Sequence, residues 1–176
     1  MEGVKIGQKV PEFSAEAYHV GKFTRVKSSD FKGKWMVLFF YPLDFTFVCP
    51  TEIEGFAAKE AEFKKRNAVV IGASTDSVHS HKAWFERDLQ QVKFPVLADT
   101  THAVAKLFGI LKEDQGIAYR GTFIIDPEGM LRYVVVSDLS VGRNVEETLR
   151  VLIALQSGEL CPVEWKPGEK TLGKSR

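Results

Sequence analysis

The stretch that decides the fold is WMVLFFYPLDFTFVCPTE, residues 35–52. Residues 35–41 are apolar at every position instead of alternating, which is typical of a central strand covered on both faces. Pro42 ends this run, and beyond Cys49 apolar residues recur at near-helical spacing in a segment rich in Lys and Glu. The stretch therefore predicts a strand, a loop and a helix, with Cys49 at the opening turn of that helix.

The position of Cys49 suggests a reactive thiol. Unpaired backbone N–H groups and the positive end of the helix dipole meet at an opening turn, and both favour the thiolate over the thiol. The thiolate is the nucleophilic form of cysteine. The alternative for Cys49 is a small buried hydrophobic side chain, and for Cys161, the second of the two cysteines, a bystander role.

The rest of the chain alternates strands and helices and then changes pattern. Residues 69–74 and 94–98 are apolar runs typical of strands, and residues 78–91 are a second candidate helix. This alternation favours an α/β fold with parallel neighbours joined by right-handed crossovers. Residues 122–136 instead predict an antiparallel hairpin around an Asp-Pro-Glu-Gly turn, and residues 145–155 predict a last amphipathic helix capped by Asn144.

We therefore predict a thioredoxin-like α/β fold: a mixed central sheet flanked by helices, with an N-terminal extension and a C-terminal arm. The predicted core domain covers residues 1–157, and the arm, residues 158–176, carries Cys161. A chain of 176 residues with 44% hydrophobic residues suits one globular domain better than two.

Charge and composition limit the kinds of partner and the location that we expect for the protein. The 24 basic and 23 acidic residues leave a net charge of +1, which favours small-molecule or protein partners over nucleic acid or a membrane. Residues 1–7 do not resemble a signal peptide, and the longest apolar run, residues 35–41, is far shorter than the ~18 residues of a membrane span. We expect a soluble, cytoplasmic protein.

A metal site is not expected, because the chain has no Cys-x-x-Cys pair and His79 and His81 would diverge on a helix. The four histidines are interpreted as ordinary surface or helix residues without a partner that would make any of them a general base. Trp84 is expected in the core or in a pocket wall.

The motif around Cys49 has the form Pro-x-x-x-Thr-x-x-Cys, from Pro42 through Thr46. With it, the chain closely resembles the typical two-cysteine peroxiredoxins, above all the peroxidase component of bacterial alkyl hydroperoxide reductase. The resemblance extends over nearly the whole chain, through STDS at residues 74–77 with Trp84, RGTFIID at 120–126, VGR at 141–143 and GELCPVEW at 158–165.

The resemblance implies a role for each matching residue. Cys49 would be the peroxidatic cysteine, which attacks a peroxide oxygen and becomes a sulfenic acid. Thr46 would hold the peroxide and the thiolate in line, and Pro42 would shield the thiolate from water. Arg120 would stabilise the thiolate and donate hydrogen bonds to the peroxide oxygens. Two of these residues also have a plainer reading: Thr46 as a turn residue and Arg120 as a surface cation.

The remaining implied residues act around this centre. Glu52 and Arg143 would orient Arg120, although Glu52 alone could serve the helix dipole and Arg143 could be a solvated loop charge. Cys161 would be the resolving cysteine, which forms a disulfide with Cys49 of the partner subunit in the family's dimer. The resemblance further implies re-reduction by thioredoxin or a flavin-containing reductase, and a dimer through a sheet edge, for which residues 131–136 are the candidate. Dimers of this family often form rings of five.

Two departures from the peroxide-sensitive members concern the speed of disulfide formation. Residues 90–95, QQVKFP, contain no Gly-Gly-Leu-Gly insertion, and the chain ends without a Tyr-Phe helix. Both elements slow the unfolding that brings the two cysteines together. The hypothesis is therefore fast disulfide formation and resistance to overoxidation to sulfinic acid.

The function that the resemblance implies is a thiol peroxidase of antioxidant defence. It would reduce hydrogen peroxide and organic hydroperoxides, with no metal, haem or flavin of its own. A thioredoxin-like disulfide carrier is disfavoured, because the cysteines lie 112 positions apart instead of in a Cys-x-x-Cys motif. The alternative from another class is a holdase chaperone or a redox-relay protein.

Overall fold

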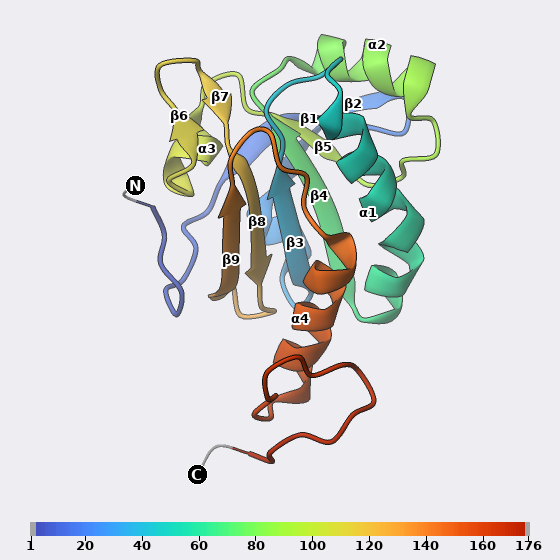
Figure 1. Ribbon diagram of the computed structural model, residues 1–176. Helices are drawn as coiled ribbons and strands as arrows, with labels where there is room; N and C mark the ends of the chain where they lie inside the picture. The colour runs from blue at the N-terminus through green and yellow to red at the C-terminus, as the bar shows by residue number, and fades with distance from the viewer. Residues whose placement is uncertain (1–2, 175–176) are drawn as a thin grey trace. The chain divides into compact units, whose positions relative to one another are not determined.

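The computed structural model describes residues 3–174 (Figure 1), and the chain divides after Arg143 into two compact units. The first unit holds a seven-stranded sheet in the order β2-β1-β5-β4-β3-β8-β9. Its strands are β1 (Ser14–His19), β2 (Lys22–Lys27), β3 (Trp35–Phe40), β4 (Ala68–Ser74), β5 (Val96–Ala98), β8 (Arg120–Ile125) and β9 (Leu131–Ser137). The other elements of this unit are η1 (Ser28–Phe31), α1 (Val48–Lys65), α2 (Val78–Asp88), α3 (Ala103–Leu107) and the short pair β6 (Leu111–Lys112) and β7 (Ile117–Ala118).

The pairing of the strands confirms the predicted mixed sheet. β3 lies near the middle, parallel to β4 and antiparallel to β8, and β4 is parallel to β5. The predicted hairpin is the antiparallel pair β8 and β9. β9 is one edge of the sheet, as expected for residues 131–136.

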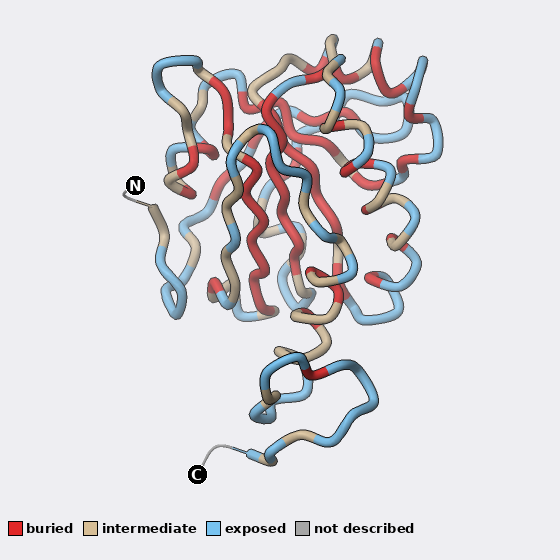
Figure 2. The backbone as a smooth tube through the Cα atoms, viewed as in Figure 1, coloured by how far each residue is buried: buried red, intermediate tan, exposed pale blue. Residues whose placement is uncertain are grey.

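The apolar run of β3 is buried because both faces of the sheet are covered. On one face the ring of Phe39 stacks on that of Phe56 from α1, with centroids 4.2 Å apart. A Cβ at Gly72 of β4 would lie 3.2 Å from the Phe39 ring, so the glycine leaves room for this stack. On the other face Phe40 contacts Phe108, which follows α3, with centroids 5.9 Å apart. Figure 2 shows the resulting continuous burial along the central strands.

The hairpin β1–β2 was not predicted. Its strands pair with each other and β1 pairs with β5, so residues 14–27 add two strands to the sheet. The turn is made by Val20 and Gly21, both with positive φ, which matches the right-handed twist of a two-residue hairpin. β1 buries Ala15, Ala17 and Tyr18, and its two buried alanines give little strand signal in a sequence.

The second unit contains α4 (Val145–Ser157) and the arm that follows it. The Asn144 side chain accepts a hydrogen bond from the backbone N–H of Glu147 at 3.1 Å, which confirms the predicted cap. The helix runs two residues beyond the predicted end at 155 and stops at Gly158, whose φ of 63° is typical of a helix C-terminus. Within residues 3–174 every helix is too short or too polar to cross a bilayer.

Candidate active site

The fold places Cys49 where the strand-loop-helix pattern predicted it. β3 ends at Phe40, a loop follows, and Cys49 is the second residue of α1, with none of its surface exposed to solvent. The residue at the helix N-cap is Phe47, and no side chain caps this end of the helix. The thiol therefore sits at a helix start that has not been closed by a capping group.

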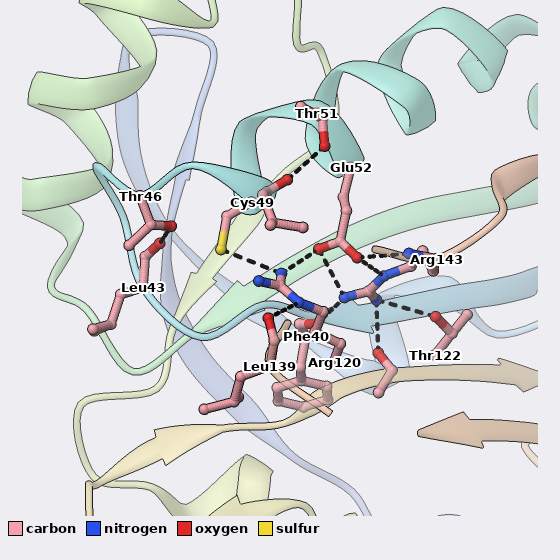
Figure 3. A network of polar contacts seen from close by, with 12 residues as sticks. Phe40, Leu43, Thr46, Cys49, Thr51, Glu52, Arg120, Thr122, Leu139 and Arg143 are labelled. Atoms are coloured by element: carbon pink, nitrogen blue, oxygen red, sulfur yellow. Dashed lines mark hydrogen bonds and ion pairs between the residues drawn. The ribbon is translucent and has the colours of Figure 1, made fainter. Parts of the chain in front are cut away.

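Arg120 reaches the sulfur of Cys49 from the neighbouring strand β8. Its Nη1 donates to Cys49 Sγ at 3.4 Å and to Glu52 Oε2 at 2.7 Å (Figure 3). Its Nε donates to the carbonyl oxygen of Leu139 at 2.8 Å. The guanidinium is 4% exposed, so a buried cation is held in contact with the thiol. The surface-cation reading of Arg120 is therefore wrong.

Glu52 and Arg143 fix the position of Arg120. Glu52 lies three residues after Cys49, and this spacing puts both side chains on the same side of α1. Glu52 Oε1 accepts from Arg143 Nε at 2.8 Å and from the Arg143 backbone N–H at 3.0 Å. Both side chains are nearly fully buried, so Arg143 is no solvated loop charge.

Arg143 is held by further acceptors around it. It donates from Nη1 to the Gly121 carbonyl at 3.0 Å and to Thr122 Oγ1 at 3.1 Å, and from Nη2 to the Phe40 carbonyl. Its guanidinium carbon lies 5.3 Å from the centroid of the Phe39 ring, a cation–π distance. Burial lowers the pKa of Arg143 from its ordinary value, while Glu52 acts in the opposite direction.

The charges of this buried cluster do not balance while Cys49 is a thiol. Two guanidinium groups face one carboxylate, Glu52. An uncompensated buried charge is costly, so negative charge that develops beside Arg120, whose Nη1 contacts Cys49 Sγ, is stabilised there. The arrangement can thus stabilise a nucleophilic thiolate at Cys49. Its guanidinium groups can also donate hydrogen bonds to an oxygen atom of a bound molecule on which negative charge develops during the attack.

The loop between β3 and α1 holds the other two predicted residues. Pro42 is buried at its start. The Thr46 hydroxyl donates to the carbonyl of Leu43 at 2.9 Å, which is a turn contact. Phe45 has a φ of 56°, a strained value for a bulky residue, and its ring lies 5.6 Å from that of Trp84. Trp84 is 2% exposed, which confirms its expected burial.

The interpretation of the four histidines was wrong for His81. This residue is fully buried, its Nδ1 lies 2.8 Å from Asp44 Oδ2, and its Nε2 lies 3.1 Å from the Leu97 carbonyl. Asp44 also accepts from the Tyr41 hydroxyl at 2.8 Å, and burial together with this carboxylate raises the pKa of Tyr41 well above its ordinary value. His81 thus anchors the loop that contains Asp44. A helical spacing of polar residues gave no sign of this role.

Replacing His81 with phenylalanine is expected to destabilise the protein by about 3–5 kcal/mol, because the buried Asp44 carboxylate loses its charged or hydrogen-bonded partner. Urea unfolding at neutral pH measures the change. His79 lies on the same helix but is exposed, so His79→Ala is the matched control and should change the stability by less than about 0.5 kcal/mol. Equal stabilities for the two variants would show that the Asp44 contact is dispensable.

Several groups of the site had no signal in the sequence. The carbonyls of Phe40, Gly121 and Leu139 accept from the two arginines, and backbone acceptors are present at every residue. Cys161 lies in the second unit, half-buried, with a free thiol. Among residues 3–174 no three His, Cys, Asp or Glu side chains form a group that could hold a metal ion.

The site buries a helix-start cysteine against an arginine, an arrangement suited to thiol chemistry, and the similarity to known proteins shows the class of enzyme. The model of the AhpC/TSA family matches residues 6–134, and this chain belongs to that family. It is a peroxide-reducing thiol peroxidase, an oxidoreductase that acts on peroxides.

Curated relatives and solved structures match most of the chain. Peroxiredoxin prdx-2 of Caenorhabditis elegans is 52% identical over 176 residues, which cover 95% of this chain and 88% of that protein. A protein of Clostridium pasteurianum described as a putative peroxiredoxin in the rubredoxin operon is 49% identical over 95% of this chain and 98% of its own. The structure of reduced Plasmodium vivax 2-Cys peroxiredoxin has a TM-score of 0.91 and 34% identity, and covers 94% of this chain and 91% of its own.

Proposed function

We propose that Cys49 is the peroxidatic nucleophile of this peroxidase. Its thiolate attacks one oxygen of hydrogen peroxide or an organic hydroperoxide, the O–O bond breaks, and Cys49 becomes a sulfenic acid. The leaving oxygen takes up a proton and departs as water or an alcohol. Sulfur is oxidised and the peroxide is reduced, so the step needs no further redox partner.

The observation that supports this role best is the 3.4 Å contact from Arg120 Nη1 to Cys49 Sγ inside a cluster with an excess positive charge. Arg120 compensates the thiolate and the charge that develops on the peroxide oxygens. Glu52 and Arg143 keep its guanidinium in place through their ion pairs. For Thr46 the proposal requires its hydroxyl to leave the Leu43 carbonyl and hold the peroxide, while Pro42 limits access of water.

The second half of the cycle uses Cys161. We infer that Cys161 of a second copy condenses with the Cys49 sulfenic acid, which releases water and forms a disulfide between the two chains. A dithiol donor, thioredoxin or a flavin-containing disulfide reductase, then reopens this disulfide. The proposal places Cys161 on a C-terminal arm that begins at residue 158, beyond the core domain.

The proposed assembly is a homodimer, with a pentamer of dimers as the larger form. β9 supports the dimer because it is an edge strand of the described sheet. Residues 7 and 8 bond to its first residue, Leu131, and the open part of such an edge can pair with that of another copy. Several of its residues are only half-buried, among them Val134 and Val136. Antioxidant defence in the cytoplasm, without nucleic acid or membrane as partner, completes the proposal.

A non-reducing gel tests the assignment of the two cysteines. After one equivalent of peroxide, we expect the parent protein to run as a dimer that reductant returns to monomer. Cys161→Ser should stay monomeric, yet a sulfenic-acid reagent such as dimedone should label Cys49, as shown by the mass of its peptide. A parent protein that stays monomeric, or label on a cysteine other than Cys49, would contradict the proposal.

A further inference from the structure

A hollow in the first unit opens at the end of the sheet that lies away from Cys49. Three segments form most of its lining: residues 9–13, residues 28–34 around η1, and residues 125–129, which make the turn between β8 and β9. The hollow encloses about 570 Å³, a volume within the usual range of small-molecule sites. Figure 1 shows the β8–β9 turn at the opposite end of the sheet from the start of α1. We call it the first hollow.

Backbone hydrogen bonds join the three segments of the first hollow into a closed ring. Each segment is tied to the other two by an N–H that donates to a carbonyl: Val10 to Gly129 at 2.9 Å, Gly33 to Pro127 at 3.2 Å, and Ser28 to Phe13 at 2.9 Å. Ser28 Oγ also accepts from the Phe13 N–H at 3.1 Å. The walls are therefore held in place without a ligand, and a pre-formed site loses little conformational entropy on binding.

The floor of the first hollow is apolar and belongs to the hydrophobic core. Met36 and Ile125 are partners in the register of β3 and β8, and each is 4% exposed. Phe13 is buried beside them, and the ring of Phe31 is half-buried in the wall. An apolar group that enters the hollow removes its own surface from water. The two phenylalanine rings favour a flat aromatic group, because aromatic rings pack well on one another.

Lys9 connects the first hollow to a second hollow beside it. Lys9 and Pro11 line both, and the second hollow is also lined by Lys5 and Lys106. Among the described residues, the lining of the second hollow contains three lysines and no acidic residue. A Cβ added at Gly129 would lie 3.9 Å from Lys9 Cε, so the Lys9 side chain passes close to the β8–β9 turn. A cation thus stands where the two hollows meet.

The charges around the two hollows are mainly positive. Their lining includes five lysines: Lys5, Lys9, Lys32, Lys34 and Lys106. Within residues 3–174 none of these five has an ion-pair partner. The lining also includes three acidic residues: Glu12, Asp126 and Glu128. Asp126 is neutralised by Arg132, at 2.6 Å, so the positive charges exceed the negative ones. Such a surface attracts anions, and salt screens the attraction.

We propose that the two hollows form one binding site for a small amphipathic anion of the aryl phosphate class. The aromatic ring of the ligand lies on the apolar floor of the first hollow, between the walls that carry Phe13 and Phe31. The anionic group is held by Lys9 and faces the lysines of the second hollow. The site contains neither cysteine, so the inference does not depend on the proposed function.

Isothermal titration calorimetry of the full-length protein with naphthyl phosphate at low salt tests the site. We expect one molecule per chain. Naphthol and inorganic phosphate each use only one half of the site, so each should bind at least about tenfold more weakly. Raising the salt from about 0.02 to about 0.2 M should weaken the binding of naphthyl phosphate several-fold and leave that of naphthol unchanged. Equal affinities for naphthyl phosphate and naphthol would overturn the class of ligand.

Two variants test the two halves of the site separately. Ser29 lines the first hollow and is half-buried, so Ser29→Phe fills part of the space and should lower the affinity for naphthyl phosphate and for naphthol at least about tenfold. Lys9→Gln should lower the affinity for naphthyl phosphate about three- to tenfold and leave that for naphthol unchanged. Lys22→Gln removes an exposed lysine of β2 that lines neither hollow, so it is the matched control and should bind like the parent.

Peroxide consumption in the presence of dithiothreitol shows whether the variants are folded. Ser29 and Lys9 lie outside the candidate active site, so parental rates are expected. If Ser29→Phe does not fold, Lys9→Gln decides, since Lys9 is exposed. A parent protein that does not bind naphthyl phosphate, or a folded Lys9→Gln that binds it with the parental affinity, would overturn the site. Either result would leave the proposed roles of Cys49 and Cys161 untouched.

Discussion

Replacing Cys49 with serine is expected to abolish peroxide consumption while the fold is kept. Serine is close to cysteine in size and fits the fully buried position, but its hydroxyl stays neutral near pH 7 and is a poor nucleophile without a general base. Arg120 contacts Cys49 Sγ, and Arg143 pairs with Glu52. Arginine cannot accept a proton, so neither side chain can act as a general base for a serine hydroxyl. Direct measurement of peroxide loss in the presence of dithiothreitol gives the result.

Cys161→Ser is the matched control for this experiment. It should still consume peroxide, because dithiothreitol can reduce the Cys49 sulfenic acid in place of the resolving thiol. Urea unfolding of both variants checks that the fold is intact. Peroxide consumption by Cys49→Ser at the parental rate would show that another group carries the reaction.

Replacing Arg120 with methionine is expected to slow the reaction of Cys49 with peroxide by about 10²–10³-fold, the usual effect of removing one preorganised donor from a site where charge develops. Methionine has a similar length without charge, so the thiolate loses its nearest cation and the peroxide loses its hydrogen-bond donors. Stopped-flow measurement of the second-order rate constant for thiol oxidation gives the effect.

Two further arginine variants complete this test. Arg120→Lys keeps the charge but loses the fork that contacts both Cys49 Sγ and Glu52 Oε2, so its rate should lie between those of the parent and Arg120→Met. Arg132→Met removes an arginine from β9 that pairs with Asp126, and it should react at the parental rate. An Arg120→Met rate equal to that of the parent would remove Arg120 from the reaction.

The elements that were predicted correctly are those whose own sequence carries a strong pattern, such as an apolar run, a turn motif or a capping residue. The continuous apolar run became β3, the Asp-Pro-Glu-Gly turn became the β8–β9 hairpin, and Asn144 caps α4. The unpredicted parts depend on neighbours distant in sequence. The alanines of β1 become buried only when β1 pairs with β5, a strand that follows about 80 residues later in the sequence.

The same distinction holds for the site. The motif around Cys49 and the Arg-Gly-Thr-Phe segment identify the residues by resemblance, but their contact joins positions 71 residues apart. That contact exists because β8 lies beside β3, a pairing that single-sequence patterns do not determine. The partner of His81 was missed for the same reason, since Asp44 reaches it across 37 residues.

Under the proposed role of Cys49, we expect the buried cluster around Glu52 to couple oxidation of the thiol to the packing around it. With Cys49 ionised, two cations face two anions, but a sulfenic acid is neutral, so peroxide reduction leaves one guanidinium without a counter-charge. An unpaired buried charge costs several kcal/mol. The reaction therefore weakens the packing around its own product. Under the proposed function we expect the start of α1, where no side chain caps the helix, to yield and release Cys49 toward a second thiol.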